Sequence, residues 1–178
     1  MKVLAFAGSN SKKSINKELV TYASSLFSSD NIEILDLNNF EVPIFGVDLE
    51  SEIGIPSKVN EFANKISESD LILVSLAEHN GSFSAVFKNL YDWISRISDR
   101  KVFDNKPVLL MATSPGGRGG AGVLEAAEVR FPRDGANLLG VFSLPSFYDN
   151  FQNGKITNLE LDTELKKNIE EVKKKINS

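Results

Sequence analysis

The chain has 178 residues, of which 42% are hydrophobic and 25% are charged, and its formal net charge is −4. These values are typical of one compact domain with a sizeable core. The absence of cysteine excludes disulfides, thiolate metal sites and cysteine nucleophiles, and the single histidine, His79, excludes a site built from several histidines. The mild negative charge disfavours nucleic acids and anionic membranes as partners.

No targeting or membrane segment is indicated. The first apolar run, Val3 to Ala7, reaches a polar loop at Gly8 and is too short for the apolar region of a signal peptide. No apolar run approaches the ~20 residues needed to span a bilayer. We therefore expect a cytoplasmic protein.

Strand-like and helix-like segments alternate along the chain. Predominantly apolar or alternating segments predict five strands, over residues 2–7, 31–37, 70–76, 106–113 and 136–142. Apolar residues at helical spacing predict five helices, over residues 16–27, 55–67, 85–97, 123–130 and 161–176. Residues 40–54, which contain a proline and two glycines, are expected to form a long connection. This alternation predicts a single α/β domain, residues 1–178, with a five-stranded parallel sheet between two helical layers.

Three polar or glycine-rich loops follow the first, third and fourth predicted strands. They are residues 8–16 (GSNSKKSIN), 77–82 (AEHNGS) and 114–122 (SPGGRGGAG). In an open doubly wound sheet, ligands bind beyond the carboxyl ends of the strands, where the strand order reverses. A strand order of 2-1-3-4-5 would bring all three loops together, so we expect the ligand there.

The first loop offers hydroxyl groups at the start of a helix. It contains neither GxGxxG nor GxxxxGK[ST], which disfavours a dinucleotide fingerprint and a P-loop. Ser9, Ser11 and Ser14 lie beside a helix N-terminus, where backbone N–H groups and the helix dipole favour an anion. Ser14 could equally be a simple N-cap. This loop by itself leaves both interpretations open.

The second and third loops contain residues suited to a flat ligand. After an apolar strand, the chain places Glu78, His79, Asn80 and Gly81 in a row. Gly81 allows close backbone approach, and Asn80 can both donate and accept hydrogen bonds with a pyrimidine-like ring. An ordinary turn with a serine N-cap is the alternative. The four glycines between Pro115 and Ala121 in the third loop suit a phosphate or a flat ring, and they also suit a lid or a surface turn.

Read together, the three loops resemble those of the NADPH-dependent FMN reductase family, which includes quinone, chromate and azo reductases. The family's first loop, G-S-x-R-x-x-S-x-N, matches residues 8–16 with Ser11 at the arginine position. Its second signature, P-E-Y-N-x-S-x-P-x-x-L-K-N-x-x-D-W, matches residues 77–93, where Ala77 and Ser84 replace the prolines and His79 replaces the tyrosine. The resemblance covers residues 1–145.

The arginine departure concerns phosphate binding. Arginine binds phosphate through two parallel hydrogen bonds, whereas lysine acts as a point charge. The resemblance therefore implies lower FMN affinity, with Lys12 or Lys13 supplying the positive charge in place of arginine.

The resemblance implies a flavodoxin-like fold and an oxidoreductase that passes hydride from NADPH or NADH through bound FMN to a small acceptor. A quinone, an azo compound or free flavin would serve as acceptor. A homodimer or homotetramer is implied, with contacts in residues 40–54 and 83–93. No metal and no catalytic side chain are implied. The implied cofactor-binding residues are Ser9, Ser11, Ser14, Ile15 and Asn16 at the phosphate, Glu78, His79, Asn80 and Gly81 along the flavin ring edge, and Ser114 and Gly117 on the other side.

Two other functions are compatible with this fold. A flavodoxin-type electron carrier would bind FMN without reacting with NADPH, but such carriers are usually strongly acidic, and a net charge of −4 is mild. A flavin-free regulatory or binding module is the second alternative, because fold does not determine function. The departures at Ser11, Ala77, His79 and Ser84 keep the second alternative open.

Overall fold

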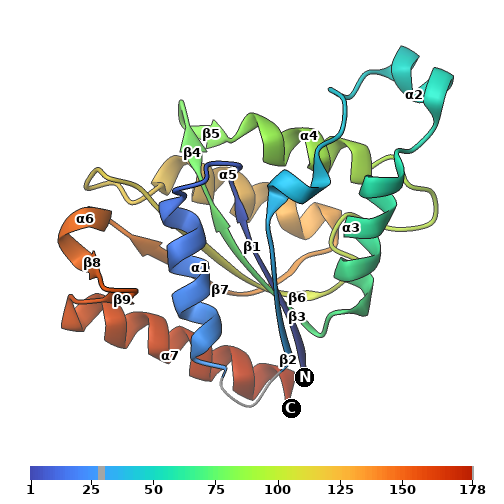
Figure 1. Ribbon diagram of the computed structural model, residues 1–178. Helices are drawn as coiled ribbons and strands as arrows, with labels where there is room; N and C mark the ends of the chain where they lie inside the picture. The colour runs from blue at the N-terminus through green and yellow to red at the C-terminus, as the bar shows by residue number, and fades with distance from the viewer. Residues whose placement is uncertain (28–30, 178) are drawn as a thin grey trace.

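A five-stranded parallel sheet lies at the centre of the structure, a computed structural model that describes residues 1–27 and 31–177 (Figure 1). Residues 28–30 and 178, which belong to the predicted domain span, lie outside the described residues. The strand order is β2-β1-β3-β6-β7, and every neighbouring pair is parallel. Counted along the chain within this sheet, the order is 2-1-3-4-5, so the predicted fold class is confirmed. The strand bounds are β1 Lys2–Gly8, β2 Asn31–Leu35, β3 Leu71–Leu76, β6 Pro107–Thr113 and β7 Asn137–Leu144.

Helices cover both faces of the sheet, which is the middle of three layers (Figure 1). One face carries α3, α4 and α5, and the other carries α1 and α7. All five helices were predicted, each to within three residues at either end. Their bounds are α1 Ile15–Ser25, α3 Ser57–Glu68, α4 Ala85–Ile94, α5 Ala121–Arg130 and α7 Leu159–Ile176.

The two faces of the sheet carry separate apolar clusters, because alternate residues of a strand point to opposite faces. In β1, Leu4 and Phe6 belong to the cluster under α3, α4 and α5, whereas Val3 and Ala5 belong to the cluster under α1 and α7. All four side chains are buried. Burial on both faces explains why the central strands have continuous apolar sequences.

Side-chain caps account for two of the boundaries that differ from prediction. β2 ends at Leu35, because the Asp36 carboxylate accepts a hydrogen bond from the Asn38 N–H (2.9 Å) and begins a 3₁₀ turn. α7 begins two residues earlier than predicted, because the Asn158 side chain caps it. Polar caps therefore set these ends more sharply than the apolar pattern does.

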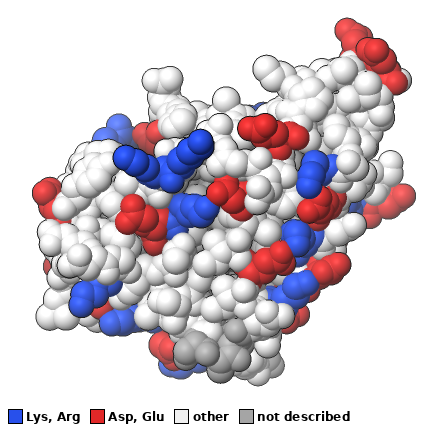
Figure 2. All heavy atoms as spheres, in the orientation of Figure 1, with Lys and Arg blue, Asp and Glu red and all other residues white. Residues whose placement is uncertain are grey.

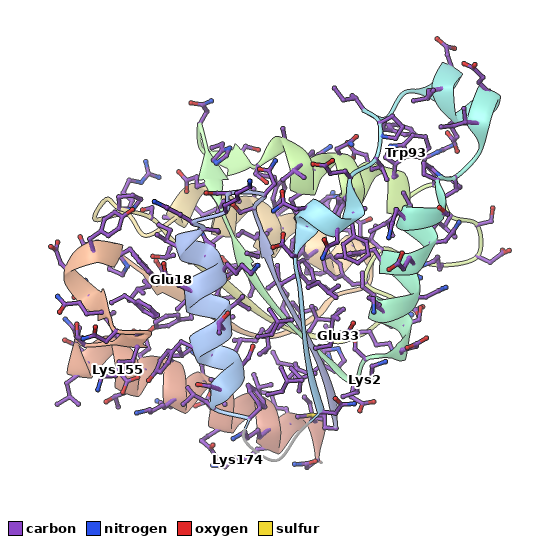
Figure 3. The ribbon with its side chains drawn as sticks, viewed as in Figure 1. Lys2, Glu18, Glu33, Trp93, Lys155 and Lys174 are labelled. Atoms are coloured by element: carbon purple, nitrogen blue, oxygen red, sulfur yellow. The ribbon has the colours of Figure 1, made fainter. Side chains whose placement is uncertain are left out.

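The predicted connection over residues 40–54 contains a short helix, α2 (Val47–Ile53), that the apolar pattern did not indicate. This helix buries no residue and projects from the body of the molecule (Figure 1). The base of the projection is held by Trp93 of α4, whose indole N–H donates to the Pro43 carbonyl at 2.8 Å (Figure 3). The Phe45 ring meets the indole edge-on at 5.1 Å. The Arg96 side chain also pairs with Glu50 of α2 at 2.9 Å, so the projection is held both at its base and at the helix itself.

Short elements complete the described chain. No helix within residues 1–27 and 31–177 combines the length and apolarity that crossing a bilayer would need. The short elements are the 3₁₀ turns η1 Leu37–Phe40 and η2 Phe131–Asp134, the helix α6 Phe147–Asn150, and the strands β4 Glu78–His79, β5 Ser82–Phe83, β8 Phe151–Gln152 and β9 Lys155–Ile156.

Candidate functional site

A cavity of about 210 Å³ opens beyond the carboxyl ends of β1, β3 and β6, where the three predicted loops meet. Its wall includes residues from all three loops, as the strand order predicted. Asn80, Gly81 and Gly117 lie outside the wall. The other predicted site residues line it: Ser9, Ser11, Ser14, Ile15, Asn16, Glu78, His79 and Ser114.

The first loop is organised by its own serine hydroxyls. The Ser9 Oγ accepts from the Ser11 N–H (3.2 Å), and the Ser11 Oγ accepts from the Lys13 N–H (3.3 Å). Ser14 caps α1 by accepting from the Lys17 N–H at 3.2 Å. Ser14 therefore both caps the helix and lines the cavity. Within the described part of the chain, none of the three hydroxyls donates its proton to a protein acceptor, so all three donors are available to a ligand.

The Asn16 side chain connects three elements at the wall of the cavity. Its side chain is buried, and its Oδ1 accepts from the Thr113 N–H (3.0 Å) and the Ser75 hydroxyl (2.7 Å). Its Nδ2 donates to the Thr113 carbonyl at 3.2 Å. The amide thus joins the start of α1 to β3 and β6, and one N–H of its side chain is left for a ligand.

The second loop is a β-hairpin, which corrects the prediction of a loop without strands over residues 77–82. β4 and β5 pair antiparallel, with Asn80 and Gly81 at the tip at φ values of 53° and 75°. Two residues with positive φ form the tight hairpin turn for which Asn-Gly is the preferred sequence. The Asn80-Gly81 dipeptide is thus the local sequence signal for this hairpin. The positive φ of Gly81 serves the turn, and no atom lies within 4 Å of a Cβ built there.

The Glu78 side chain lines the cavity and also contacts α5. Its Oε2 accepts from the Val123 N–H at 3.1 Å, and Gly120 at the N-cap of α5 has no capping side chain. A carboxylate at a helix N-terminus is stabilised by the free N–H groups and the helix dipole. A Cβ at Gly122 would lie 3.3 Å from both carboxylate oxygens, so glycine leaves room for this contact. Glu78 therefore ties the second loop to the third.

The third loop is fastened to the chain that follows β7. The Ser114 and Gly116 carbonyls accept from the Phe147 and Ser146 N–H groups, each at 3.0 Å. Gly119 has a φ of 58°, and a Cβ there would lie 2.2 Å from the Ser143 Oγ. This loop is thus a packed structure and not an open surface turn.

Basic side chains gather at the first turn of α1 (Figure 2). Lys13 lines the cavity, and Lys12, Lys13 and Lys17 line an adjoining hollow of about 220 Å³. Lys17 pairs with Asp36 at 2.5 Å, and this hydrogen bond holds the pKa of the Asp36 carboxyl below its usual value. Lys12 and Lys13 have no acidic partner among the described residues, so their charge is available to an anion.

The cavity wall also contains three residues that were not predicted as site residues, Thr113, Pro115 and Tyr148. Thr113 and Pro115 adjoin a predicted site residue, Ser114. Tyr148 lies in α6, beyond the matched signatures, and no sequence pattern placed it near the other loops.

The family model described as NADPH-dependent FMN reductase matches residues 1–149. The chain belongs to the NADPH-dependent FMN reductase family. This confirms the resemblance expected from the loops, and with it an oxidoreductase class that uses FMN and NAD(P)H.

Relatives in this family carry quinone reductase names. The quinone reductase of Escherichia coli strain K12 is 30% identical over 122 residues, which cover 68% of this chain and 64% of that protein. The NADPH:quinone oxidoreductase of Arabidopsis thaliana is 35% identical over 124 residues, covering 67% and 61%. The aligned segments thus span less than two thirds of these two relatives.

Solved structures share the fold. The flavoenzyme NAD(P)H:(acceptor) oxidoreductase FerB from Paracoccus denitrificans has a TM-score of 0.74 at 23% identity, with 97% of each chain covered. An azoreductase from Bacillus anthracis has a TM-score of 0.61 at 17% identity, with 99% of each chain covered. At these identities the likeness supports the fold, and the function rests on the family and the site.

Proposed function

We propose that this FMN reductase family member passes hydride from NAD(P)H through FMN, bound in the cavity at the start of α1, to a small acceptor of the quinone class. The observation that carries the proposal is the meeting of three donor-bearing loops at one helix N-terminus. The acceptor class is supported by the names of the quinone reductase relatives. We further propose that residues 1–178 form a single domain that works in the cytoplasm, where NAD(P)H is available.

The phosphate of FMN is assigned to the first loop. Its donors would be the hydroxyls of Ser9, Ser11 and Ser14, the backbone N–H groups of Ile15 and Asn16, and the ammonium of Lys13. Within the described chain, these two N–H groups have no protein acceptor, as is usual in the first turn of a helix. Lys13 lines the cavity itself, whereas Lys12 lines only the adjoining hollow, so Lys13 is the better substitute for arginine.

The flavin ring is assigned to the space between the hairpin and the third loop. Glu78 and His79 would contact the ring edge mainly through backbone groups, because the Glu78 carboxylate is already committed to α5. Asn80 and Gly81 would contribute from the hairpin tip, and Ser114 and Gly117 from the opposite side. Bound FMN supplies the two-electron chemistry. The protein's task is to orient the ring and leave one face open, and no side chain is assigned a catalytic role.

We also propose a homodimer or homotetramer with contacts in residues 40–54 and 83–93. Ile44, Val47 and Ile53 of the projecting segment are 85%, 67% and 50% exposed. Apolar side chains grouped on a projection are typical of a protein interface. Light scattering of the purified protein would give the mass, and a monomer at micromolar concentration would contradict this part of the proposal.

Visible absorption tests the function directly. The purified protein would be supplied with FMN, freed of excess flavin and then mixed with NADPH without oxygen. Retained flavin absorbance that bleaches promptly supports the reductase. Retained absorbance that persists with both NADPH and NADH would indicate an electron carrier. A protein that retains no flavin would indicate a binding module, and the proposed function would be wrong.

A further inference from the structure

Tyr148 is an aromatic residue at the cavity that belongs to neither apolar cluster of the core. It is 66% exposed, and among the phenylalanines, tyrosines and the tryptophan of the described chain it alone is exposed. It lines the cavity together with residues of all three loops. In residues 1–27 and 31–177, no protein group hydrogen-bonds to its hydroxyl. An exposed ring at the wall of a cavity gains stabilisation only when a ligand or partner covers it.

The chain holds Tyr148 firmly in this place. The two residues before it donate backbone hydrogen bonds to the third loop, and the Asn150 side chain donates to the Pro145 carbonyl at 2.9 Å. The Phe147 ring meets Tyr148 edge-on at 5.5 Å and stacks on Phe151 at 4.8 Å. Because Phe147 and Phe151 belong to the buried cluster under α1 and α7, the exposed ring stands on a rigid base.

Ser146 supports the same conclusion. It is not glycine, yet it adopts the left-handed conformation, at φ 46° and ψ 58°. Such residues are strained and persist where surrounding contacts impose them, often at ligand sites. The turn at Ser146 allows α6 to start beside the third loop, which places Tyr148 at the cavity.

We infer that Tyr148 is the aromatic wall of the flavin site and packs against the isoalloxazine–ribityl part of bound FMN. This rests on the proposed function. Apart from the imidazole of His79, the cavity wall contains no other aromatic ring. A flat aromatic ring system packs favourably against an aromatic face, through a contact that does not involve the phosphate. Tyr148 would thus supply affinity that the first loop, with Ser11 in place of arginine, does not.

Binding of FMN and of riboflavin, which lacks the phosphate, separates this contact from the phosphate site. Flavin-depleted wild type, Tyr148→Phe, Tyr148→Ala and Lys13→Ala would each be titrated with both flavins by fluorescence. Tyr148→Phe should bind both within about twofold of wild type, because the ring is kept. Tyr148→Ala should weaken both by the same factor, about threefold to tenfold, and leave bound flavin more fluorescent. Lys13→Ala should weaken FMN alone.

Val129→Ala serves as the matched control, since Val129 is 64% exposed on α5 and does not line the cavity. Melting temperatures should agree among all variants, because the Tyr148, Lys13 and Val129 side chains are all exposed. Where riboflavin binds too weakly to measure, the fluorescence of bound FMN decides the question.

The outcomes separate the inference from the proposed function. Wild type that binds neither flavin would overturn both. Wild type that binds FMN, with Tyr148→Ala unchanged in affinity and fluorescence, would overturn the inference alone. A loss confined to FMN, with unchanged fluorescence, would place Tyr148 at the phosphate and would also overturn it.

Discussion

The two ends of the cavity are built in different ways. The serines of the first loop form hydrogen bonds with residues two or three positions away, between Ser9 and Lys17, and only the end of the loop, at Asn16, also bonds to β3 and β6. The ring end depends on contacts between distant residues, such as Glu78 with Val123 and Ser114 with Phe147, which are 45 and 33 positions apart. Substitutions in the first loop should therefore change ligand binding, whereas substitutions at the ring end should change stability as well.

Gly119→Ala should have the largest effect. The added Cβ would lie 2.2 Å from the Ser143 Oγ and 2.9 Å from the Pro145 nitrogen, at a φ of 58° that alanine disfavours. We expect a loss of about 3 kcal/mol in the free energy of unfolding, measured by urea denaturation, and weaker FMN binding. Gly116→Ala is the control, since no atom lies within 4 Å of its Cβ. A loss of equal size in both variants would contradict the packing argument.

Ser11→Arg, at the phosphate end of the cavity, should change FMN affinity without changing stability. Restoring a guanidinium at this position of the first loop should tighten FMN binding about tenfold and leave riboflavin binding unchanged. The free energy of unfolding should stay nearly unchanged, because Ser11 is exposed. Ser25→Arg adds the same charge at the far end of α1 and should not affect either flavin. Equal tightening by both variants would show a general charge effect instead.

Glu78→Ala should cost about 1 kcal/mol in the free energy of unfolding, because the Val123 N–H loses its acceptor and α5 loses its capping charge. Glu125→Ala is the matched control, since Glu125 is an exposed residue of the same helix. Thermal melting of both variants measures the difference. No difference between them would mean that the contact between the second and third loops does not stabilise the ring end.

Asp36→Asn should have the smallest effect. It removes the partner of Lys17 beside the first loop and should tighten FMN binding about twofold at low salt, with the gain lost near 0.5 M salt. Because the pKa of Asp36 is lowered from 3.8, the pair stabilises the fold above that pH. This contribution is lost as the pH falls through the lower value of the folded state. A gain in affinity that survives high salt would contradict the electrostatic explanation.

Local signals predicted much of the fold and part of the candidate site. The apolar run of β3 and the spacing of Leu19 and Ala23 in α1 identified these elements, because burial imposes a period along the chain. The first loop lies where the sequence predicted it, because its serines form hydrogen bonds with residues close to them in the chain. The Asn80–Gly81 hairpin was also a local signal, but it was interpreted as a loop.

The sequence by itself determined the alternation of elements, the parallel sheet, the serine-rich turn and the family resemblance, all of which depend on residues close together in the chain. Only the tertiary structure decided that Asn16 braces β3 and β6, that Glu78 caps α5, and that Tyr148 stands at the cavity. These contacts join residues that are 45 to 97 positions apart or lie on separate strand ends. No local period encodes such pairs, because the packing of the helices on the sheet brings them together.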